Sequence, residues 1–433
     1  MNYDTRRLTG WTAAVVTTAA FAKTFLPFYL IGSTPIFAAA SAVGVALVAL
    51  TWRSIHDMAS KIPDIALVLA AFYGLVTISF VVHSHPAVPM THLVGILVFH
   101  TLFLSFGFSA ARALSIVLIV LLGSAAIYAI AIIHYTVQFG DLMKEGYLHD
   151  IFGIGKPGVF LTFHQNIGIV LGLAALAALG LSSNRIKRAF AIGALPLILL
   201  FMFYIAARGA LVALVCSLAF LAGAGAWVRS RKLTLFAVVV IIMVAALGSG
   251  LFYQRALQSK DVDPIAPDAI SRTIREIQEP RPGFRMQIWA GAWHRISSEP
   301  DRLLFGRGIG MYPVIEGFGA PNWLLRKSEG SKHYPHNLYL EMLYETGIAG
   351  LLLFGLLTLS PLGIALRRWQ LFSPVQKSAL SMYVFQLVSS QLSGAFAFGY
   401  LDQFFFGLAV GIIALSRAND ASVRDQIAIR GAE

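Results

Sequence analysis

Continuous stretches of about 20 apolar residues recur along most of this chain and constrain its fold more than any other feature. They do not alternate apolar with polar residues, so they indicate helices and not strands. A helix within a bilayer satisfies all of its backbone hydrogen bonds internally. We therefore predict an all-α integral membrane protein.

Composition supports this prediction. Of the 433 residues, 57% are hydrophobic and only 12% are charged, which is too apolar for an ordinary soluble domain. The net charge of +12 follows from the positive-inside rule in a multispanning protein, so we expect no nucleic-acid partner. The single cysteine, Cys216, lies within an apolar stretch, so we expect no disulfide or thiolate metal site in the loops.

We predict about a dozen spans. The first follows two arginines, as a signal peptide would, but it is long and a second span follows directly, so we expect it to remain as an anchor. The predicted spans are residues 10–32, 34–51, 63–82, 89–107, 113–137, 164–182, 188–206, 208–228, 233–253, 338–366, 376–396 and 400–416.

Lysine and arginine distribution orients these spans. The basic groups fall on the side of both termini, whereas the alternate short connections carry neither residue type. Because cytoplasmic loops are enriched in both, we predict cytoplasmic termini. The groups are Arg6 and Arg7, Arg53 and Lys61, Arg112, Arg185 with Lys187 and Arg188, Arg229 with Arg231 and Lys232, and Arg367 with Arg368 and Lys377.

The chain divides into four predicted parts. Spans occupy 1–253, a large outward loop 254–335, further spans 336–416, and a cytoplasmic tail 417–433. The loop contains DP, AP, EP and RP dipeptides that break regular elements, but one helix is predicted within it. Its apolar face would pack on the membrane-proximal surface; alternatively, its two tryptophans only anchor at the headgroups. That face comprises Ile288, Trp289, Ala292, Trp293 and Ile296.

The segment KHYPHNLYLEMLYETGIAG, from Lys332, carries the candidate base. Pro335 is suited to a first helical turn, which places His336 at a helix N-terminus on the outer face. The helix dipole there disfavours the imidazolium, so His336 would stay neutral and accept a proton. The alternative is a solvated or capping histidine. We also expect Lys332, Tyr339 and Glu341 to contact substrate.

His333, His336, Glu341 and Glu345 are residue types that can bind a metal ion. On one helix, Glu345 would lie roughly 180° and Glu341 about 140° around from His336, so one ion cannot easily collect them. We therefore expect no metal and no cofactor. The two glutamates could instead orient His336 or bind sugar hydroxyls.

Arg208 lies between two apolar runs at the predicted outer face. An arginine there costs a few kcal/mol unless it snorkels or is paired, and its fork fits phosphate oxygens bidentately. Arg208 would therefore either bind the phosphate of a lipid or form a structural ion pair. Arg281, Arg285 and Arg307 are further cations that would hold a diphosphate leaving group, or are simply solvated charges.

Two shorter patterns complete the candidate site. GRGIG at 306–310 lacks the third glycine and the βαβ context of a dinucleotide fingerprint, so we interpret it as a turn. HQN opens the sixth predicted span, where His164 and Asn166 could bind a sugar or headgroup. Asn166 alone would fit a helix cap equally well.

Together these patterns resemble the O-antigen ligase and polymerase superfamily of bacterial envelope biogenesis. The resemblance rests on HQN, on AARGALVALV, on RMQIWAGAW followed by LLFGRGIGMYP, and on HNLYLEMLYETGIAG after the large loop. It implies a GT-C-type glycosyltransferase of the bacterial inner membrane with a periplasmic active site. The reaction implied is metal-independent and inverting, and ligates O-antigen from undecaprenyl diphosphate onto lipid A-core oligosaccharide in lipopolysaccharide biosynthesis.

The resemblance also assigns roles. His336 would activate the acceptor hydroxyl, while Arg208 and Arg285 would bind the diphosphate. Ala207 stands where the family often has serine, so a hydroxyl contact to the carrier is absent there.

Three alternatives stay open. O-antigen polymerase and protein O-oligosaccharyltransferase use the same kind of donor; a compact chain without an appended soluble domain favours the ligase. A lipid-linked-glycan transporter belongs to another class, but paired repeats and ionisable residues at the membrane midplane are not visible.

Overall fold

The computed structural model describes residues 3–25, 33–86, 88–139, 160–182, 184–204, 207–229, 284–316 and 334–430. Every regular element in these ranges is an α-helix or a short 3-10 helix, and they contain no strand. The all-α prediction is therefore confirmed for the described part of the chain.

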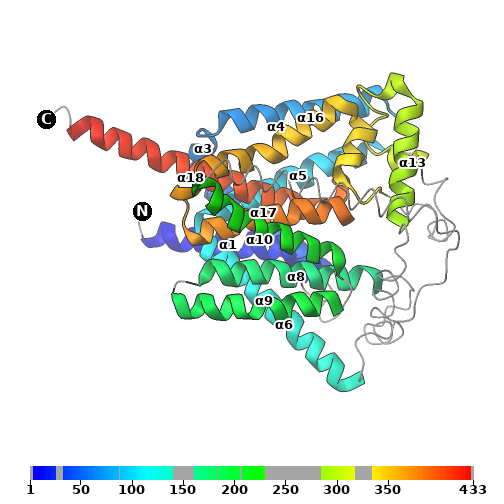
Figure 1. The fold of residues 1–433 in the computed structure, drawn as a ribbon. Coiled ribbons are helices and arrows are strands. Elements are labelled where there is room, and N and C mark those ends of the chain that lie inside the picture. Colours follow the sequence, from blue (N-terminus) through cyan, green and yellow to red (C-terminus); the bar gives the residue numbers. More distant parts are fainter. Residues whose placement is uncertain are drawn as a thin grey trace. The chain divides into compact units, whose positions relative to one another are not determined.

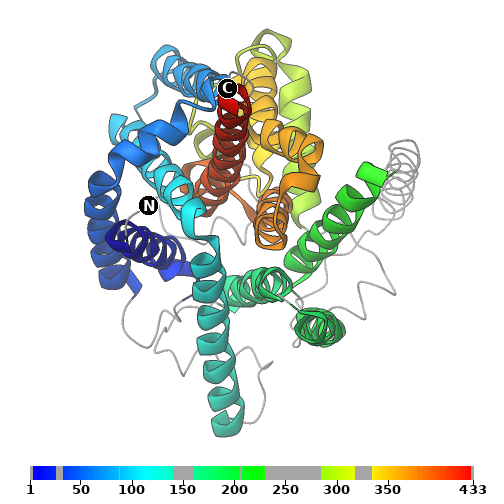
Figure 2. The ribbon, with the colours of Figure 1, turned by 90° about the vertical axis from the view of Figure 1, so that its left-hand side faces the viewer.

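The chain forms two compact units, each built from three stretches of sequence (Figures 1 and 2). Unit 1 comprises Met1–Thr51, Ser109–Pro282 and Arg368–Ser389, and unit 2 comprises Trp52–Phe108, Gly283–Arg367 and Ser390–Glu433. The α-helices of unit 1 are α1 (Tyr3–Phe25), α2 (Ser33–Leu50), α6 (Leu114–Phe139), α8 (Phe160–Leu181), α9 (Arg185–Tyr204), α10 (Arg208–Arg229) and most of α17 (Pro374–Ser393). Those of unit 2 are α3 (Trp52–Ala59), α4 (Pro63–Val82), nearly all of α5 (Met90–Ala110), α13 (Phe284–Ser298), α14 (Tyr312–Ile315), α16 (Leu338–Arg367) and α18 (Tyr400–Arg430).

Each predicted span except 233–253 overlaps one of these helices; residues 233–253, and 26–32 of the first span, lie outside the described residues. Five helical runs within the described part are long and apolar enough to cross a membrane, which makes the chain a multi-pass membrane protein. They are Pro63–Val82, Met90–Ile127, Gly209–Ala226, Leu338–Arg367 and Tyr400–Asp420. The full topology of twelve spans stays a prediction.

Unit 1 packs around α8, which lies beside α6, α9 and α10. In both views, α8 and α9 run side by side with nearly parallel axes (Figures 1 and 2). Small residues permit a close approach of α8 to the start of α10, since a Cβ on Gly168 would lie 2.5 Å from the Cβ of Ala207. Gly172 and Gly180 make similar room for Phe385 and Ser378. Small residues at helix contacts are expected where lipid supplies no hydrophobic drive for association.

Unit 2 packs around α16, which contacts α4, α13 and α18. In Figure 1, α13 runs across the ends of α4 and α16. The backbones of α5 and α18 meet closely, because a Cβ on Gly107 would lie 1.8 Å from the Phe404 carbonyl oxygen. Near the start of α4, the Arg417 guanidinium donates to both carboxylate oxygens of Asp64, at 2.7 and 2.9 Å. The α18 helix continues through Arg430, beyond the predicted span end at 416.

The span predicted at 338–366 is not one straight helix. Gly347 has φ 67° and ψ −166°, and it divides α16 into a first segment, 338–346, and a second segment, 347–367. The break is sharp enough for the Tyr339 hydroxyl to form a 2.8 Å hydrogen bond with Thr358 Oγ1. Glycine accommodates this left-handed backbone without a Cβ penalty, which is why the chain can turn here.

Candidate functional site

The turn that carries His336 is held on both sides. The indole Nε1 of Trp289, on α13, donates to the carbonyl oxygen of Pro335 at 2.7 Å. On the other side, Asn337 Oδ1 accepts from the backbone N–H of Leu340 at 2.9 Å, which is the geometry of an N-cap. The helix begins at Leu338, so Pro335 precedes the first turn and is not part of it, contrary to the prediction.

His336 itself has φ 55°, the only positive φ of a non-glycine residue in the described ranges. A left-handed residue with a Cβ costs about 1–2 kcal/mol, and histidine tolerates it better than most side chains. Neighbouring hydrogen bonds must therefore maintain this conformation. His336 is half-buried, and hydrogen bonds from α13 and at the start of α16 fix the backbone on either side of it.

The glycine-rich turn at 306–310 packs directly onto the break in α16. Gly306, Gly308 and Gly310 all have positive φ, so the interpretation of GRGIG as a turn is confirmed. A Cβ on Gly306 would lie 2.4 Å from the Glu345 carbonyl carbon, so no larger residue fits. The backbone N–H groups of Arg307 and Gly308 donate to the carbonyls of Tyr344 and Glu345, at 3.2 and 2.9 Å.

The Glu345 carboxylate fills the concave side of this turn. It is buried, and its Oε1 accepts from the Tyr312 backbone N–H at 3.0 Å, with a second backbone hydrogen bond from Gly310. Successive backbone N–H groups in such turns form anion-binding concavities. Here a side chain of the protein occupies that position, which explains why the sequence looks like a phosphate-binding fragment without the context of one.

Glu341, the second buried carboxylate of α16, binds a different backbone segment of unit 2. Both of its oxygens lie 3.1 Å from the backbone N–H of Phe396, at the start of the 3-10 helix Phe396–Phe398. The Phe396 carbonyl lies 2.8 Å from His100 Nε2, and His100 Nδ1 lies 2.9 Å from the Tyr73 hydroxyl. Because a carbonyl only accepts, Nε2 carries the proton and Nδ1 accepts from Tyr73.

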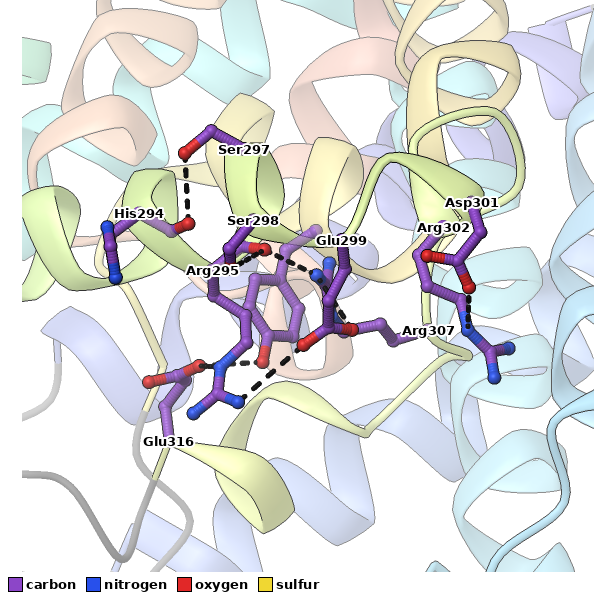
Figure 3. A network of polar contacts seen from close by, with 10 residues as sticks. His294, Arg295, Ser297, Ser298, Glu299, Asp301, Arg302, Arg307 and Glu316 are labelled. Atoms are coloured by element: carbon purple, nitrogen blue, oxygen red, sulfur yellow. Dashed lines mark hydrogen bonds and ion pairs between the residues drawn. The ribbon is translucent and has the colours of Figure 1, made fainter.

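A third polar network joins α13 to the first segment of α16 (Figure 3). The buried guanidinium of Arg307 pairs with Glu299 at 3.2 Å, donates to the Arg295 carbonyl at 2.7 Å and lies 4.7 Å from the ring centre of Tyr344. The Glu316 carboxylate accepts from Arg295 Nε at 3.0 Å and from the Tyr344 hydroxyl at 2.8 Å. This hydrogen bond raises the pKa of the Arg295 guanidinium.

Apolar packing supports the same contact. On α13, Ala292 and Ile296 are buried against Tyr312 and Tyr344, with Ile288 alongside. This confirms the predicted apolar face for those three positions, whereas Trp293 is 59% exposed. Burial raises the pKa of the hydroxyls of Tyr312 and Tyr334 above the usual value.

Residues 193–355 match a family described as O-antigen ligase. The match covers the predicted AARGALVALV, RMQIWAGAW, LLFGRGIGMYP and HNLYLEMLYETGIAG segments in their expected order. This segment is similar to the O-antigen ligase family, and the similarity supports a place for the chain in the O-antigen ligase superfamily. No curated protein matched the chain. That family implies a glycosyltransferase-like enzyme of the ligase and polymerase type, with lipid-linked glycan and lipid substrates in general.

Unit 2 brings several predicted site residues together. His336, Tyr339 and Glu341 lie in and just before the first segment of α16, and α13 packs against that helix. Arg285 is the second residue of α13, and its side chain lies outside the described residues. Arg281, Lys332 and His333 also lie outside them. Within the described ranges, no group of three or more His, Cys, Asp or Glu residues has the arrangement of a metal site.

Unit 1 brings the other two predicted patches together. Arg208 is the first residue of α10, and the start of α10 packs against α8 at Gly168, two residues after Asn166. Asn166 is half-buried within α8 and does not begin it, since α8 starts at Phe160. The side chains of His164 and Arg208 lie outside the described residues.

Three residues that were predicted to contact substrate also have protein partners. Arg307 is buried and ion-paired, Glu341 binds a backbone amide, and the Tyr339 hydroxyl binds Thr358. Such buried polar groups are costly unless paired, so these contacts are needed by the fold. Sequence analysis missed the roles of Trp289 and Glu345. Spacing within one helix does not show which distant backbone group a side chain meets.

Proposed function

We propose that this protein ligates O-antigen polysaccharide from undecaprenyl diphosphate onto lipid A-core oligosaccharide. In this proposal it lies in the bacterial inner membrane with twelve spans, both termini in the cytoplasm and the His336 turn facing the periplasm. The observation that carries the proposal is the left-handed turn of His336, held by Trp289 and Asn337. Backbone strain maintained by surrounding contacts is typical of functional positions.

The chemistry requires few groups. The anomeric carbon of the donor already carries a diphosphate leaving group, so the enzyme must neutralise charge and position the acceptor. The acceptor hydroxyl oxygen bonds to that carbon as the carbon–oxygen bond to the diphosphate breaks, with inversion. His336 accepts the hydroxyl proton, and undecaprenyl diphosphate leaves carrying the bond electrons. No step of this reaction requires a metal ion.

Arg208 and Arg285 are proposed to bind the diphosphate. A guanidinium matches two phosphate oxygens at once and stays charged at any physiological pH. Arg307, Tyr339 and Glu341 take a positioning role in this proposal, because their polar groups already have partners within unit 2. His164, Asn166, Arg281 and Lys332 keep their expected substrate contacts.

The test is reconstitution of the purified chain in liposomes with undecaprenyl-diphosphate-linked glycan and lipid A-core. Ligation predicts glycosylated lipid A-core and one released undecaprenyl diphosphate per glycan. Longer carrier-linked glycan without capped core would instead indicate a polymerase. Donor that crosses the bilayer with no carrier released would indicate a transporter and would overturn the proposal.

Arginine variants test the donor site in the same assay. Arg208→Ala and Arg285→Ala should each lower kcat/KM for the donor by about 10- to 150-fold, which corresponds to the roughly 1.5–3 kcal/mol of a hydrogen bond to a charged group. Arg302→Ala is the matched control, because Arg302 is an exposed cation that pairs only with its neighbour Asp301 among the described residues. Donor use at the wild-type level in both arginine variants would remove the diphosphate assignment.

A further inference from the structure

Three consecutive apolar residues are exposed just after α13. Leu303, Leu304 and Phe305 are 38, 54 and 55% exposed. They follow the 3-10 helix Pro300–Arg302, whose Asp301 and Arg302 are exposed and charged. Contiguous apolar exposure of this kind marks a surface that contacts something other than water.

The backbone of this segment is paired with α16. The carbonyls of Leu303 and Leu304 accept from the N–H groups of Ile348 and Ala349, at 2.9 and 3.1 Å. The Gly306 N–H donates to the Arg302 carbonyl at 2.8 Å. Non-helical backbone is tolerated at membrane depth only where such partners replace water. The segment therefore meets the backbone requirement for contact with lipid.

Two helices of unit 2 show at what depth the segment lies. The second segment of α16, 347–367, extends about 30 Å at 1.5 Å per residue, which equals the thickness of a bilayer's hydrocarbon core. Its first residue, Gly347, lies against Leu304, since a Cβ there would be 2.4 Å from the Leu304 carbonyl. Residues 303–305 thus lie at one end of this hydrocarbon-length helix.

The α4 helix gives the same depth independently. Its 20 residues, Pro63–Val82, also extend about 30 Å. Just beyond its end, His83 lies against the same turn, because a Cβ on Gly308 would be 2.6 Å from the His83 Cβ. The apolar surface continues on both helices, with Val82 68% exposed on α4 and Leu352 67% exposed on α16.

We propose that residues 303–305 insert into the bilayer lipid where acyl chains meet headgroups, in the leaflet on the α13 side. The partner is membrane lipid, whose acyl chains cover the three apolar side chains while Asp301 and Arg302 stay among the headgroups. Apolar side chains flanked by charged residues are typical of interfacial anchors. The anchor holds the start of the glycine turn, and through it α13, at a fixed depth.

Spin labels at three depths test this insertion. In a Cys216→Ala background, single cysteines replace Asp301, Phe305 and Leu356, and each nitroxide-labelled protein is reconstituted in phospholipid vesicles. Power saturation then compares collision with oxygen, which concentrates in acyl chains, and with water-soluble nickel-EDDA. The label at Phe305→Cys should favour oxygen, less strongly than Leu356→Cys, while Asp301→Cys should favour nickel. Leu356 is 53% exposed on the second segment of α16 and is the lipid reference.

Two results would overturn the insertion. A Phe305→Cys label as accessible to nickel-EDDA as Asp301→Cys would place the segment in water. A label shielded from both reagents would place it against protein, such as a second copy of this chain. Leu304→Cys repeats the measurement one position away, and unchanged thermal unfolding of each labelled protein shows that the substitution preserved the fold.

Discussion

The two segments of α16 were predicted as one span but lie in different surroundings. In the first segment, Glu341 and Glu345 are fully buried and bind backbone N–H groups of other elements. In the second, Leu352, Leu356 and Leu359 are more than half exposed. The first segment thus organises a polar site and the second presents an apolar surface to lipid. The first segment carries two glutamates and the second is almost wholly apolar, but the position of the break depends on the backbone angle of a single glycine.

The largest expected effect comes from closing that break. Gly347→Ala places a Cβ 2.4 Å from the Leu304 carbonyl and forces a left-handed alanine, so we expect a loss of about 3 kcal/mol or more in unfolding free energy. Thermal unfolding of the purified protein in detergent measures it. Gly355→Ala is the matched control on the second segment, where a Cβ meets nothing within 4 Å and stability should be unchanged or slightly raised. Equal stability of the two variants would show that the segments do not differ in this way.

Arg307 gives the next largest effect. Arg307→Ala leaves Glu299 and the Tyr344 ring without their cation, and breaking a buried ion pair costs about 3–5 kcal/mol, which is lowered here because Glu299 is 38% exposed. We expect roughly 2 kcal/mol by the same reasoning. The thermal unfolding temperature should therefore fall while KM for the donor stays near the wild-type value. A raised KM with unchanged stability would restore Arg307 to the substrate-binding residues.

Glu345 tests the polar character of the first segment. Glu345→Leu removes the acceptor of the buried Tyr312 N–H, so we expect a loss of about 1–3 kcal/mol. Glu345→Gln keeps an acceptor oxygen and should lose less. Leu356→Ala on the second segment should stay within about 0.5 kcal/mol, because that side chain faces outward. Urea or heat unfolding of the three variants measures these losses. If Leu356→Ala lowered the unfolding free energy most, the two segments of α16 would not differ as described.

Substitution of Trp289 gives the smallest expected effect, which is on kcat. Trp289→Phe keeps an aromatic ring but removes the indole N–H that donates to the Pro335 carbonyl, which lowers the unfolding free energy by about 1 kcal/mol. We expect kcat to fall about 5-fold, with KM for the donor unchanged, since His336 loses position and not charge. Trp293→Phe, on the exposed side of the same helix, should have no effect. If KM rose while kcat stayed constant, Trp289 would act on donor binding instead.

Apolar periodicity predicted much of the described fold correctly. Continuous apolar stretches located most of the long described helices, although α1 and α18 differ from their predicted bounds by several residues or more; burial in lipid imposes helical hydrogen bonding. The turn at GRGIG and the apolar face of Ile288, Ala292 and Ile296 followed from glycine chemistry and helical spacing. These features depend on local sequence alone.

Long-range partners were not predictable in this way. The sequence gives no sign that Glu345 binds a backbone amide near residue 312, or that Trp289 fixes the carbonyl before His336. The ion pair of Arg307 with Glu299, the residue just before the 3-10 helix Pro300–Arg302, is likewise not visible in the spacing. Such contacts depend on how α13 crosses α16, which tertiary packing decides.

The most direct test of the account is the transfer rate of His336→Ala with saturating lipid-linked donor and lipid A-core acceptor. General base catalysis contributes about 10²- to 10⁴-fold, so transfer should fall by at least about 100-fold while thermal unfolding and donor binding stay unchanged. His294→Ala, an exposed histidine on α13, should transfer at the wild-type rate. A rate for His336→Ala within twofold of the wild type would contradict the account and leave His336 a turn residue of the fold.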